Sequence, residues 1–261
     1  MQARLRRITS LTAIEPGAWN ALAGDNPFLK HEFLLALERS GCVGGHTPWQ
    51  QTHLLAEDKA GRLLGALPLY LKYDSRGEFV FDWGWADAYE RTGRPYYPKL
   101  VCAVPFTPAT GERVLLAPGA GALEVAHRLL RGARELAAEH GASSLHVLFP
   151  ADAQCGLFEG AGMLARKGCQ FHWHNRGYRD FEEFLATFSS AKRKKARRER
   201  RRIEEAGIVF EHLAGNEPTP ADWNAIFEFY AHTFRRRGRH PYLNRAFFDD
   251  VAGKMPHHLF V

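Results

Sequence analysis

Carboxylates, cations and aromatic rings crowd into the stretch FDWGWADAYERTGRPYYPK, residues 81–99. Two of its carboxylates, Asp82 and Asp87, have the chemistry needed to hold an amine or to take its proton, so we expect them to be catalytic. Glycine and proline interrupt the stretch, which predicts a loop without a regular element. Loops of this composition are common binding surfaces, although the same rings can simply cover a core. The candidate substrate-binding side chains here are Trp83, Trp85, Tyr89, Tyr96, Tyr97 and Lys99.

Three histidines are further candidates. His172 and His174 fall on one face of a strand predicted over residues 169–178, with Asn175 beside them. Two histidines alone make a poor metal site and no third ligand is indicated, so we expect no metal. We expect the pair to be catalytic, as general base or substrate ligand, and Asn175 to bind substrate; the alternative for each histidine is a structural hydrogen bond. His146, a candidate substrate ligand in a predicted central strand, has the same two interpretations.

Two further loops have the composition of anion sites. Thr107 and Arg113, in PFTPATGER, suit a negatively charged group of a substrate; the alternative is a turn that carries a surface arginine. Gly119 and Gly121 precede a helix predicted from Ala122. Backbone N–H groups at such a helix start can hold a phosphate, but an ordinary loop into a helix explains two glycines equally well.

Nine lysines or arginines fill the eleven positions from Lys192 to Arg202. Removing that run from the 35 basic and 29 acidic residues leaves 26 and 28, so the basic character of the chain is local. Like charges on one helix repel, which favours a polyanion partner over a solvated helix that only joins two domains. The run contains no aromatic residue, so the contact would be with phosphates of tRNA, of a nucleotide-linked precursor or of anionic lipid. The cations proposed for it are Lys192, Arg193, Lys194, Lys195, Arg197, Arg198 and Arg201.

Composition excludes several classes of protein. The longest apolar stretch, residues 62–71, has about half the length of a membrane-spanning helix, and no signal-peptide pattern opens the chain. We therefore expect a cytoplasmic protein without a membrane span. The four cysteines are widely spaced and show no zinc-site pattern. No nucleophile elbow, P-loop or zinc-protease motif is present, which removes the common hydrolase and NTPase classes.

An internal repeat organises the chain. EPGAWNAL returns as TPADWNAI, PFLKHEFLLAL as PYLNRAFFDDV, and THLLA as HHLFV, in the same order. Each copy predicts a proline-opened helix, a second helix and the start of a strand, after an upstream strand over 3–11 or 207–215. The second copy stops early, so we expect a tandem duplication with a truncated second copy.

Between the copies the hydrophobic pattern alternates strands with helices. It predicts two strands joined by a glycine turn and then a third strand near residues 77–81, followed by a buried strand within 97–108. It also predicts helices over 122–141 and over 155–168, and one helix over 181–207 that the basic run extends.

This order of elements resembles the Fem-type transferases, which are doubled relatives of the GNAT N-acyltransferases. The chain is similar to their bacterial cousins described as Fem-like peptidoglycan biosynthesis/recognition proteins, above all over residues 84–115 and 171–208. The resemblance implies an α/β fold, a GNAT-like mixed sheet flanked by helices. It further implies a first GNAT-like domain over 1–180, a basic helical connector over 181–207, and the start of a second GNAT-like domain over 208–261.

The resemblance also implies the chemistry. In such enzymes an amine attacks an activated acyl carbonyl, a CoA thioester or an aminoacyl-tRNA ester, with help from a base and from oxyanion donors. Gly119 and Gly121 would hold acyl-CoA, although Leu116 stands where the usual motif has Gln or Arg. We expect an N-acyltransferase acting on an amine, such as a cell-wall precursor. The alternative is a non-catalytic protein that binds such a precursor or RNA.

Overall fold

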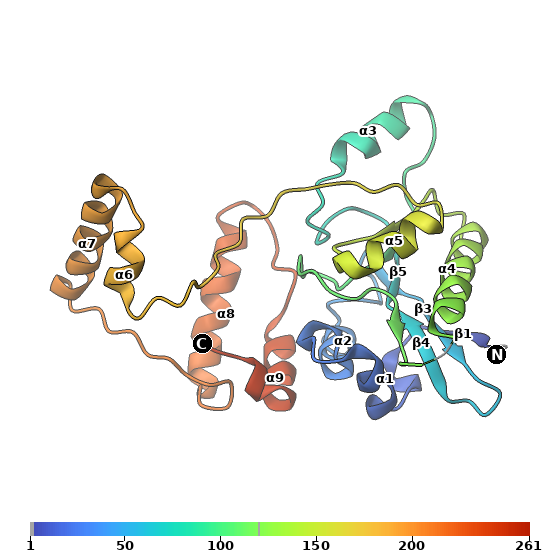
Figure 1. The fold of residues 1–261 in the computed structure, drawn as a ribbon, viewed down its shortest axis with the longest axis horizontal. Coiled ribbons are helices and arrows are strands. Elements are labelled where there is room, and N and C mark those ends of the chain that lie inside the picture. The colour runs from blue at the N-terminus through green and yellow to red at the C-terminus, as the bar shows by residue number, and fades with distance from the viewer. Residues whose placement is uncertain (1–2, 120) are drawn as a thin grey trace. The chain divides into compact units, whose positions relative to one another are not determined.

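The computed structural model describes residues 3–119 and 121–261. Its described residues up to Arg166, together with Ala214–Leu259, form one compact unit. This unit contains two four-stranded sheets (Figure 1). The first, in the order β1–β3–β4–β7, is antiparallel; the second, β2–β5–β6–β8, is mixed because β8 lies parallel to β6. The strands are β1 (Arg4–Ile8), β2 (Trp49–Gln51), β3 (His53–Glu57), β4 (Leu63–Leu67), β5 (Leu69–Lys72), β6 (Lys99–Cys102), β7 (Leu115–Leu116) and β8 (Leu145–Val147).

The chain passes from one sheet to the other at two points. Only Pro68 separates β4 from β5, and proline has no N–H group to give to a ladder. Only Thr52 separates β2 from β3, and its N–H donates to the carbonyl of Leu69 at 2.9 Å. These crossings direct β5 towards β6, where Lys72 lies opposite Lys99.

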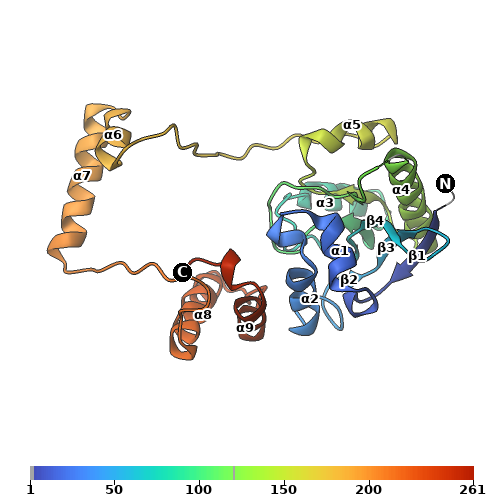
Figure 2. The ribbon, with the colours of Figure 1, turned by 60° about the horizontal axis from the view of Figure 1, so that its bottom comes forward.

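Helices cover both faces of the first sheet (Figure 2). On one face of the sheet, helices α1, α2 and α9 share an apolar core with Leu55 of β3. On the other face, α4 shares a second core with the adjacent Leu54, because successive side chains of a strand point to opposite faces. Gly132 brings α4 close to β1, since a Cβ there would lie 2.4 Å from Leu5 Cδ1. The helices of this unit are α1 (Pro16–Ala23), α2 (His31–Arg39), α3 (Trp83–Arg91), α4 (Ala122–Glu139), α5 (Asp152–Gly160), α8 (Pro220–Arg235) and α9 (Arg245–Lys254), with 3₁₀ turns at Leu11–Ala13, Pro27–Leu29 and Pro256–His258.

Residues 167–213 with 260–261 form a second compact unit, built on α6 (Phe181–Ala186) and α7 (Ser190–Glu205). An ion pair joins Arg197 to Glu182, and the Arg200 guanidinium lies 4.2 Å from the Phe181 ring. The single helix predicted over 181–207 is therefore wrong, because the chain folds back between α6 and α7.

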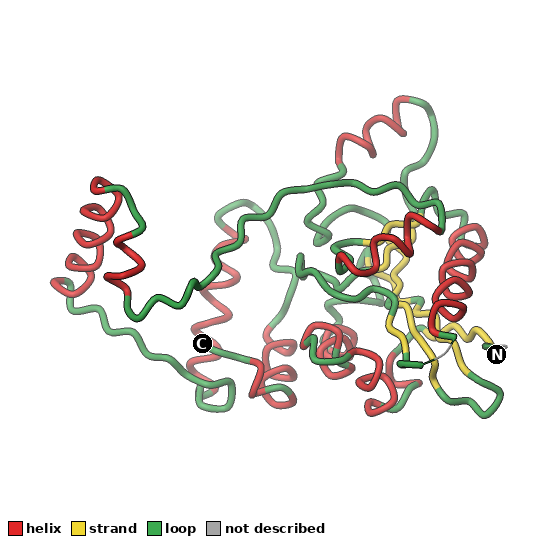
Figure 3. The backbone as a smooth tube through the Cα atoms, in the orientation of Figure 1, coloured by secondary structure: helices red, strands yellow, loops and turns green. Residues whose placement is uncertain are grey.

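Local structure differs from the prediction in five places, the first of which is the helix predicted over 155–168, which ends at Gly160 as α5. Residues 169–178 and 208–213 form no strand in the described chain (Figure 3), since an alternating pattern becomes a strand only where a neighbour pairs with it. Residues 77–81 form none either, because Phe79 and Phe81 have φ angles of 61° and 51°. The predicted loop over 81–99 instead contains α3, where Gly84 costs the helix only about 1 kcal/mol.

The α/β class, with a mixed sheet flanked by helices, is confirmed. Helices α8 and α9 follow the order of α1 and α2, and both α1 and α8 begin at a proline. The compact units divide the chain at 166/167 and at 213/214, which differs from the expected boundaries at 180/181 and 207/208. The tandem duplication and those domain boundaries stay predictions.

Candidate active site

Two lysines face each other at the end of the second sheet. Lys72 of β5 and Lys99 of β6 are opposite in the antiparallel register, and both side chains are fully buried. Charges at this depth need partners, since an uncompensated buried ion strongly destabilises a fold. The turn after β5 supplies those partners.

Lys99 has three oxygen partners. Its Nζ donates to Ser75 Oγ at 2.9 Å, to Glu78 Oε2 at 2.8 Å and to Asp82 Oδ2 at 2.5 Å. Glu78 and Asp82 are 2% and 1% exposed, so these ion pairs are shielded from water.

Lys72 is held differently. Its Nζ donates to Asp74 Oδ1 and to the Arg76 carbonyl, both at 3.1 Å, and lies 4.0 Å from the Trp49 ring centroid. Glu78 Oε1 is 4.0 Å away and links the two lysines electrostatically. We refer to Lys72, Asp74, Ser75, Glu78, Asp82 and Lys99 as the lysine cluster.

Burial and pairing set the charges of the cluster. Burial by itself raises the pKa of Asp82, but hydrogen bonding, above all by Lys99, outweighs it and lowers that pKa to about 2. Burial raises the pKa of Glu78 even though Lys99 opposes the shift. Burial lowers the pKa of Lys72 to about 8 despite the nearby Asp74 and Glu78. Asp82 is thus the firmly ionised carboxylate of the cluster.

Two carboxylate oxygens of the cluster lack donors. Glu78 Oε1 and Asp82 Oδ1 are buried and accept no hydrogen bond from any residue that the structure describes. Buried acceptors without a partner are rare in native folds and require an explanation.

Aromatic side chains surround the cluster. Tyr96 donates to Asp82 Oδ2 at 2.6 Å, and its ring contacts Tyr89, Tyr97 and His146 at centroid distances of 5.1, 5.1 and 6.2 Å. The half-buried Tyr97 hydroxyl lies 2.8 Å from Ser75 Oγ, which already accepts from Lys99. A hydrogen-bonded chain therefore runs from the buried Lys99 to Tyr97.

His146 lies on β8, beside Tyr96. Its Nε2 is 2.8 Å from Ser144 Oγ. Burial, followed by the charge of Lys99, lowers the pKa of His146 to about 4. The imidazole is therefore neutral at physiological pH, so one of its ring nitrogens can accept a hydrogen bond.

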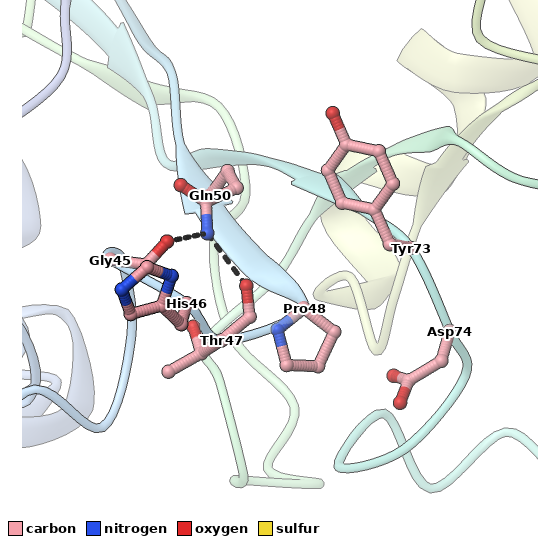
Figure 4. Close-up of a pocket in the computed structure, with 7 residues that line it drawn as sticks. All are labelled: Gly45, His46, Thr47, Pro48, Gln50, Tyr73 and Asp74. Atoms are coloured by element: carbon pink, nitrogen blue, oxygen red, sulfur yellow. Dashed lines mark hydrogen bonds between the residues drawn. The ribbon is translucent and has the colours of Figure 1, made fainter.

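A depression of about 500 Å³ adjoins the cluster (Figure 4). Asp74, which binds Lys72, lines one side of it with Tyr73. Gln50 lines the other side and donates to the carbonyls of Gly45 and Thr47 at 3.0 and 2.6 Å. The remaining lining residues are His46 and Pro48.

The position of Arg113 disagrees with the prediction that it binds an anionic group of a substrate. Arg113 is 1% exposed, and its guanidinium donates to the carbonyls of Leu148, Ala109 and Glu112. This arginine therefore fastens the loop before β7 to the end of β8. Thr107 Oγ1 likewise donates to the carbonyl of Pro105, at 3.1 Å.

Helix α3 carries four of the predicted site residues. It buries none of its residues, and Trp83, Trp85 and Asp87 are exposed. Trp85 lies 5.8 Å from the Arg166 guanidinium, whereas no hydrogen bond or ion pair joins Asp87 to another described residue. Of this helix, only Tyr89 contacts the aromatic surround of the cluster.

The second unit carries the other predicted site residues. His172 and His174 are exposed and stack at 6.3 Å, and Asn175 Oδ1 accepts from the N–H groups of Gly177 and Tyr178. The catalytic roles of the two histidines stay predictions. In α7, Lys195 pairs with Glu199 and Arg201 with Glu205, whereas no acidic side chain of the described chain pairs with Lys192, Arg193, Lys194 or Arg198.

The sequence reading missed Lys72, Asp74, Ser75 and Glu78. Lys72 and Asp74 had a detectable signal, since a lysine ends an otherwise apolar strand and an acid follows two residues later. Glu78 had no such signal in the sequence, because only the fold places it beside Lys99.

Comparison with known proteins identifies the family. A model of FemAB-like proteins, described as peptidoglycan biosynthesis/recognition, matches residues 10–261. The chain belongs to the FemAB-like family. No curated protein matches the sequence of this chain.

Three solved acetyltransferases show limited structural likeness to this FemAB-like protein. An aminoglycoside 6′-N-acetyltransferase from Acinetobacter baumannii is 14% identical, with a TM-score of 0.42, over 67% of this chain and 100% of its own. A probable acetyltransferase is 20% identical, with a TM-score of 0.37, over 68% and 99%. An acetyltransferase from Trypanosoma brucei is 14% identical, with a TM-score of 0.33, over 67% and 100%.

In the part of the chain that the structure describes, no group of three or more His, Cys, Asp or Glu side chains is placed to hold a metal ion. No helix among the described residues has the length and apolar character needed to cross a membrane.

Proposed function

We propose that this FemAB-like protein is an N-acyltransferase and that an amine receives the acyl group at the lysine cluster. The main support is the pair of buried oxygens, Glu78 Oε1 and Asp82 Oδ1, which accept no hydrogen bond within the described chain. A primary amine brings N–H donors, and a hydrogen-bond donor is what these two oxygens lack. Membership of the family agrees with a transferase.

Each nearby side chain has a role in this proposal. The amine, which reaches the site as an ammonium ion, first loses one proton to solvent. Its nitrogen then bonds to the acyl carbon, the bond to the donor's sulfur or oxygen breaks, and a second proton passes to the leaving group or to solvent. Asp82 holds the amine, and the neutral His146 accepts a hydrogen bond from it. Burial raises the pKa of Tyr97, so Tyr97 keeps its proton and donates to the carbonyl oxygen as negative charge develops there.

Two features bear on the donor, for which acyl-CoA and aminoacyl-tRNA are the candidates. Gly119 and Gly121, with φ angles of 134° and 96°, lead into α4, and a loop of this kind can hold the phosphates of CoA at a helix start. The exposed cations of α7 suit the phosphates of a tRNA. A tRNA contact would weaken steeply with added salt, whereas CoA binding at the glycine loop would be less sensitive to it.

Label transfer tests the proposal. Acyl-CoA and aminoacyl-tRNA, each labelled in the acyl group, are offered in turn with amines that include a cell-wall precursor bearing a free amino group. We expect amide product from one of the donors and none from the matching alcohol. No amide from either donor would refute the transferase and leave a non-catalytic protein that binds the precursor or RNA.

A further inference from the structure

A second group of cations lies outside both the lysine cluster and α7. The sequence RRRGRH, residues 235–240, ends α8 and forms an exposed turn, which we call the arginine loop. Gly238 has a φ of 64°, and the N–H of Arg239 donates to the carbonyl of Phe234 at 3.1 Å, so the loop has a defined shape. Cations near the end of a helix interact favourably with its dipole, but Arg237 and Arg239 lie beyond the last turn of α8.

The arginines of this loop are available to a ligand. Arg235 pairs with Glu228 at 2.8 Å. No side chain of the described chain forms a hydrogen bond or ion pair with the guanidinium groups of Arg236, Arg237 and Arg239, and all three are exposed. These three arginines lie within four residues of one another in the chain, and no described acidic side chain neutralises them, so a bound anion would lower the electrostatic energy of the loop.

Tyr242 fixes this loop against the candidate active site. Its ring stacks on Phe106 at 5.1 Å and contacts Phe79 at 6.3 Å and Phe234 at 5.2 Å. Two residues later, Asn244 Nδ2 donates to the carbonyl of Ser40 at 2.6 Å. The end of the loop is therefore held by contacts with the first 166 residues.

Phe106 connects Tyr242 to the lysine cluster. The Phe106 N–H donates to the Gly77 carbonyl at 3.1 Å, and a Cβ on Gly77 would lie 2.5 Å from Phe106 Cδ1. Gly77 directly precedes Glu78 of the cluster. Arg239 is three residues from Tyr242, a span of at most about 10 Å of extended chain. The loop thus lies within reach of a ligand that also contacts the cluster.

We infer that the arginine loop binds the diphosphate group of a small-molecule substrate whose reactive end reaches the lysine cluster. This inference rests on the proposed function, since it concerns a substrate of that site. Guanidinium groups bind phosphate oxygens in pairs of parallel hydrogen bonds, and two or three adjacent arginines match a diphosphate better than a single phosphate. The diphosphate could belong to the acyl donor or to a nucleotide-linked acceptor.

Calorimetric binding to the full chain tests the inference without any transfer step. The probes are inorganic pyrophosphate, UDP as a nucleoside diphosphate and CoA, with uridine as the uncharged control. The test variant is Arg236→Gln/Arg237→Gln/Arg239→Gln. The matched control, Arg193→Gln/Arg198→Gln/Arg202→Gln, removes three arginines from α7.

We expect the wild type and the α7 variant to bind at least one diphosphate probe equally, and the loop variant to bind it about tenfold to a hundredfold more weakly. Preference for UDP or for CoA would assign the diphosphate to the acceptor or to the donor. Unchanged binding by the loop variant, equal loss in both variants, or no diphosphate binding by the wild type would overturn the inference. Loop-dependent binding without acyl transfer would refute the proposed function alone, whereas transfer without loop-dependent binding would refute this inference alone.

Discussion

Replacing Lys99 with methionine should severely destabilise the fold. Methionine fills a similar volume but removes the ammonium group that bonds to Ser75, Glu78 and Asp82. Two carboxylates that are at most 2% exposed then lose their main counter-charge. Breaking a buried ion pair from one side typically costs about 3–5 kcal/mol. A domain of this size loses roughly 2–4 °C of Tm per kcal/mol, so we expect Tm to fall by about 6–20 °C.

Thermal and urea unfolding measure this loss, and Lys195→Met is the matched control. Lys195 pairs with Glu199 on the exposed surface of α7, where an ion pair is worth at most about 1 kcal/mol. The deficit of Lys99→Met should shrink on acidification below about pH 5, because the freed carboxylates then take up protons. A Tm for Lys99→Met within the range of the control would refute the claim that the buried ion pairs of Lys99 hold the cluster together.

Three further predictions concern single side chains. The pKa of His146 in the folded chain, about 4, lies below the ordinary 6.5, so the unfolded chain takes up a proton first as the pH drops. The free energy of unfolding should therefore fall between pH 6.5 and pH 4, by at most about 3 kcal/mol. Unfolding of His146→Gln should depend less on pH in that window, and an unchanged slope would contradict the lowered pKa. Gly77→Ala should lower the free energy of unfolding in urea by about 2–4 kcal/mol, since φ is +78° and the new Cβ meets Phe106. The control Gly93→Ala, with φ +71° and open space around the new Cβ, should lower it by about 1 kcal/mol. Equal losses of stability would show that the Phe106 contact has no role. Asp82→Asn should lower the kcat/KM of acyl transfer, whereas the exposed Asp87→Asn should not, and the reverse order would move the amine site to α3.

Periodicity predicted most elements that pack against a core. The helix predicted over 122–141 appears as α4, and the predicted central strand that contains His146 appears as β8, because their apolar residues face buried neighbours. The pattern over 169–178 is similar, but a strand also needs a pairing partner, which no local pattern reveals. Phe79 and Phe81 adopt positive φ angles, which are rare for bulky side chains, so no propensity argument could predict this conformation.

The candidate site was predicted in part. Asp82, Tyr96, Tyr97, Lys99 and His146 were chosen for their chemistry, and the structure brings these five together. Their neighbours on the turn after β5 were missed because the antiparallel register of β5 and β6 places them there, and register follows from tertiary packing. The prediction for Arg113 failed for a related reason. A loop arginine usually lies on the surface, but the hydrogen bonds from Arg113 to surrounding carbonyl groups offset the cost of burying it.

The central claim is that acyl transfer takes place at the lysine cluster. Removal of one hydroxyl group tests this claim most directly. Tyr97→Phe keeps the ring but removes the donor assigned to the carbonyl oxygen, and loss of one such donor typically lowers kcat about a hundredfold to a thousandfold. Tyr89→Phe is the matched control, because its ring also contacts Tyr96 while its hydroxyl has no partner among the described residues. We predict that kcat for label transfer falls by that factor in Tyr97→Phe and is little changed in Tyr89→Phe. Full transfer activity in a folded Tyr97→Phe variant would contradict the account.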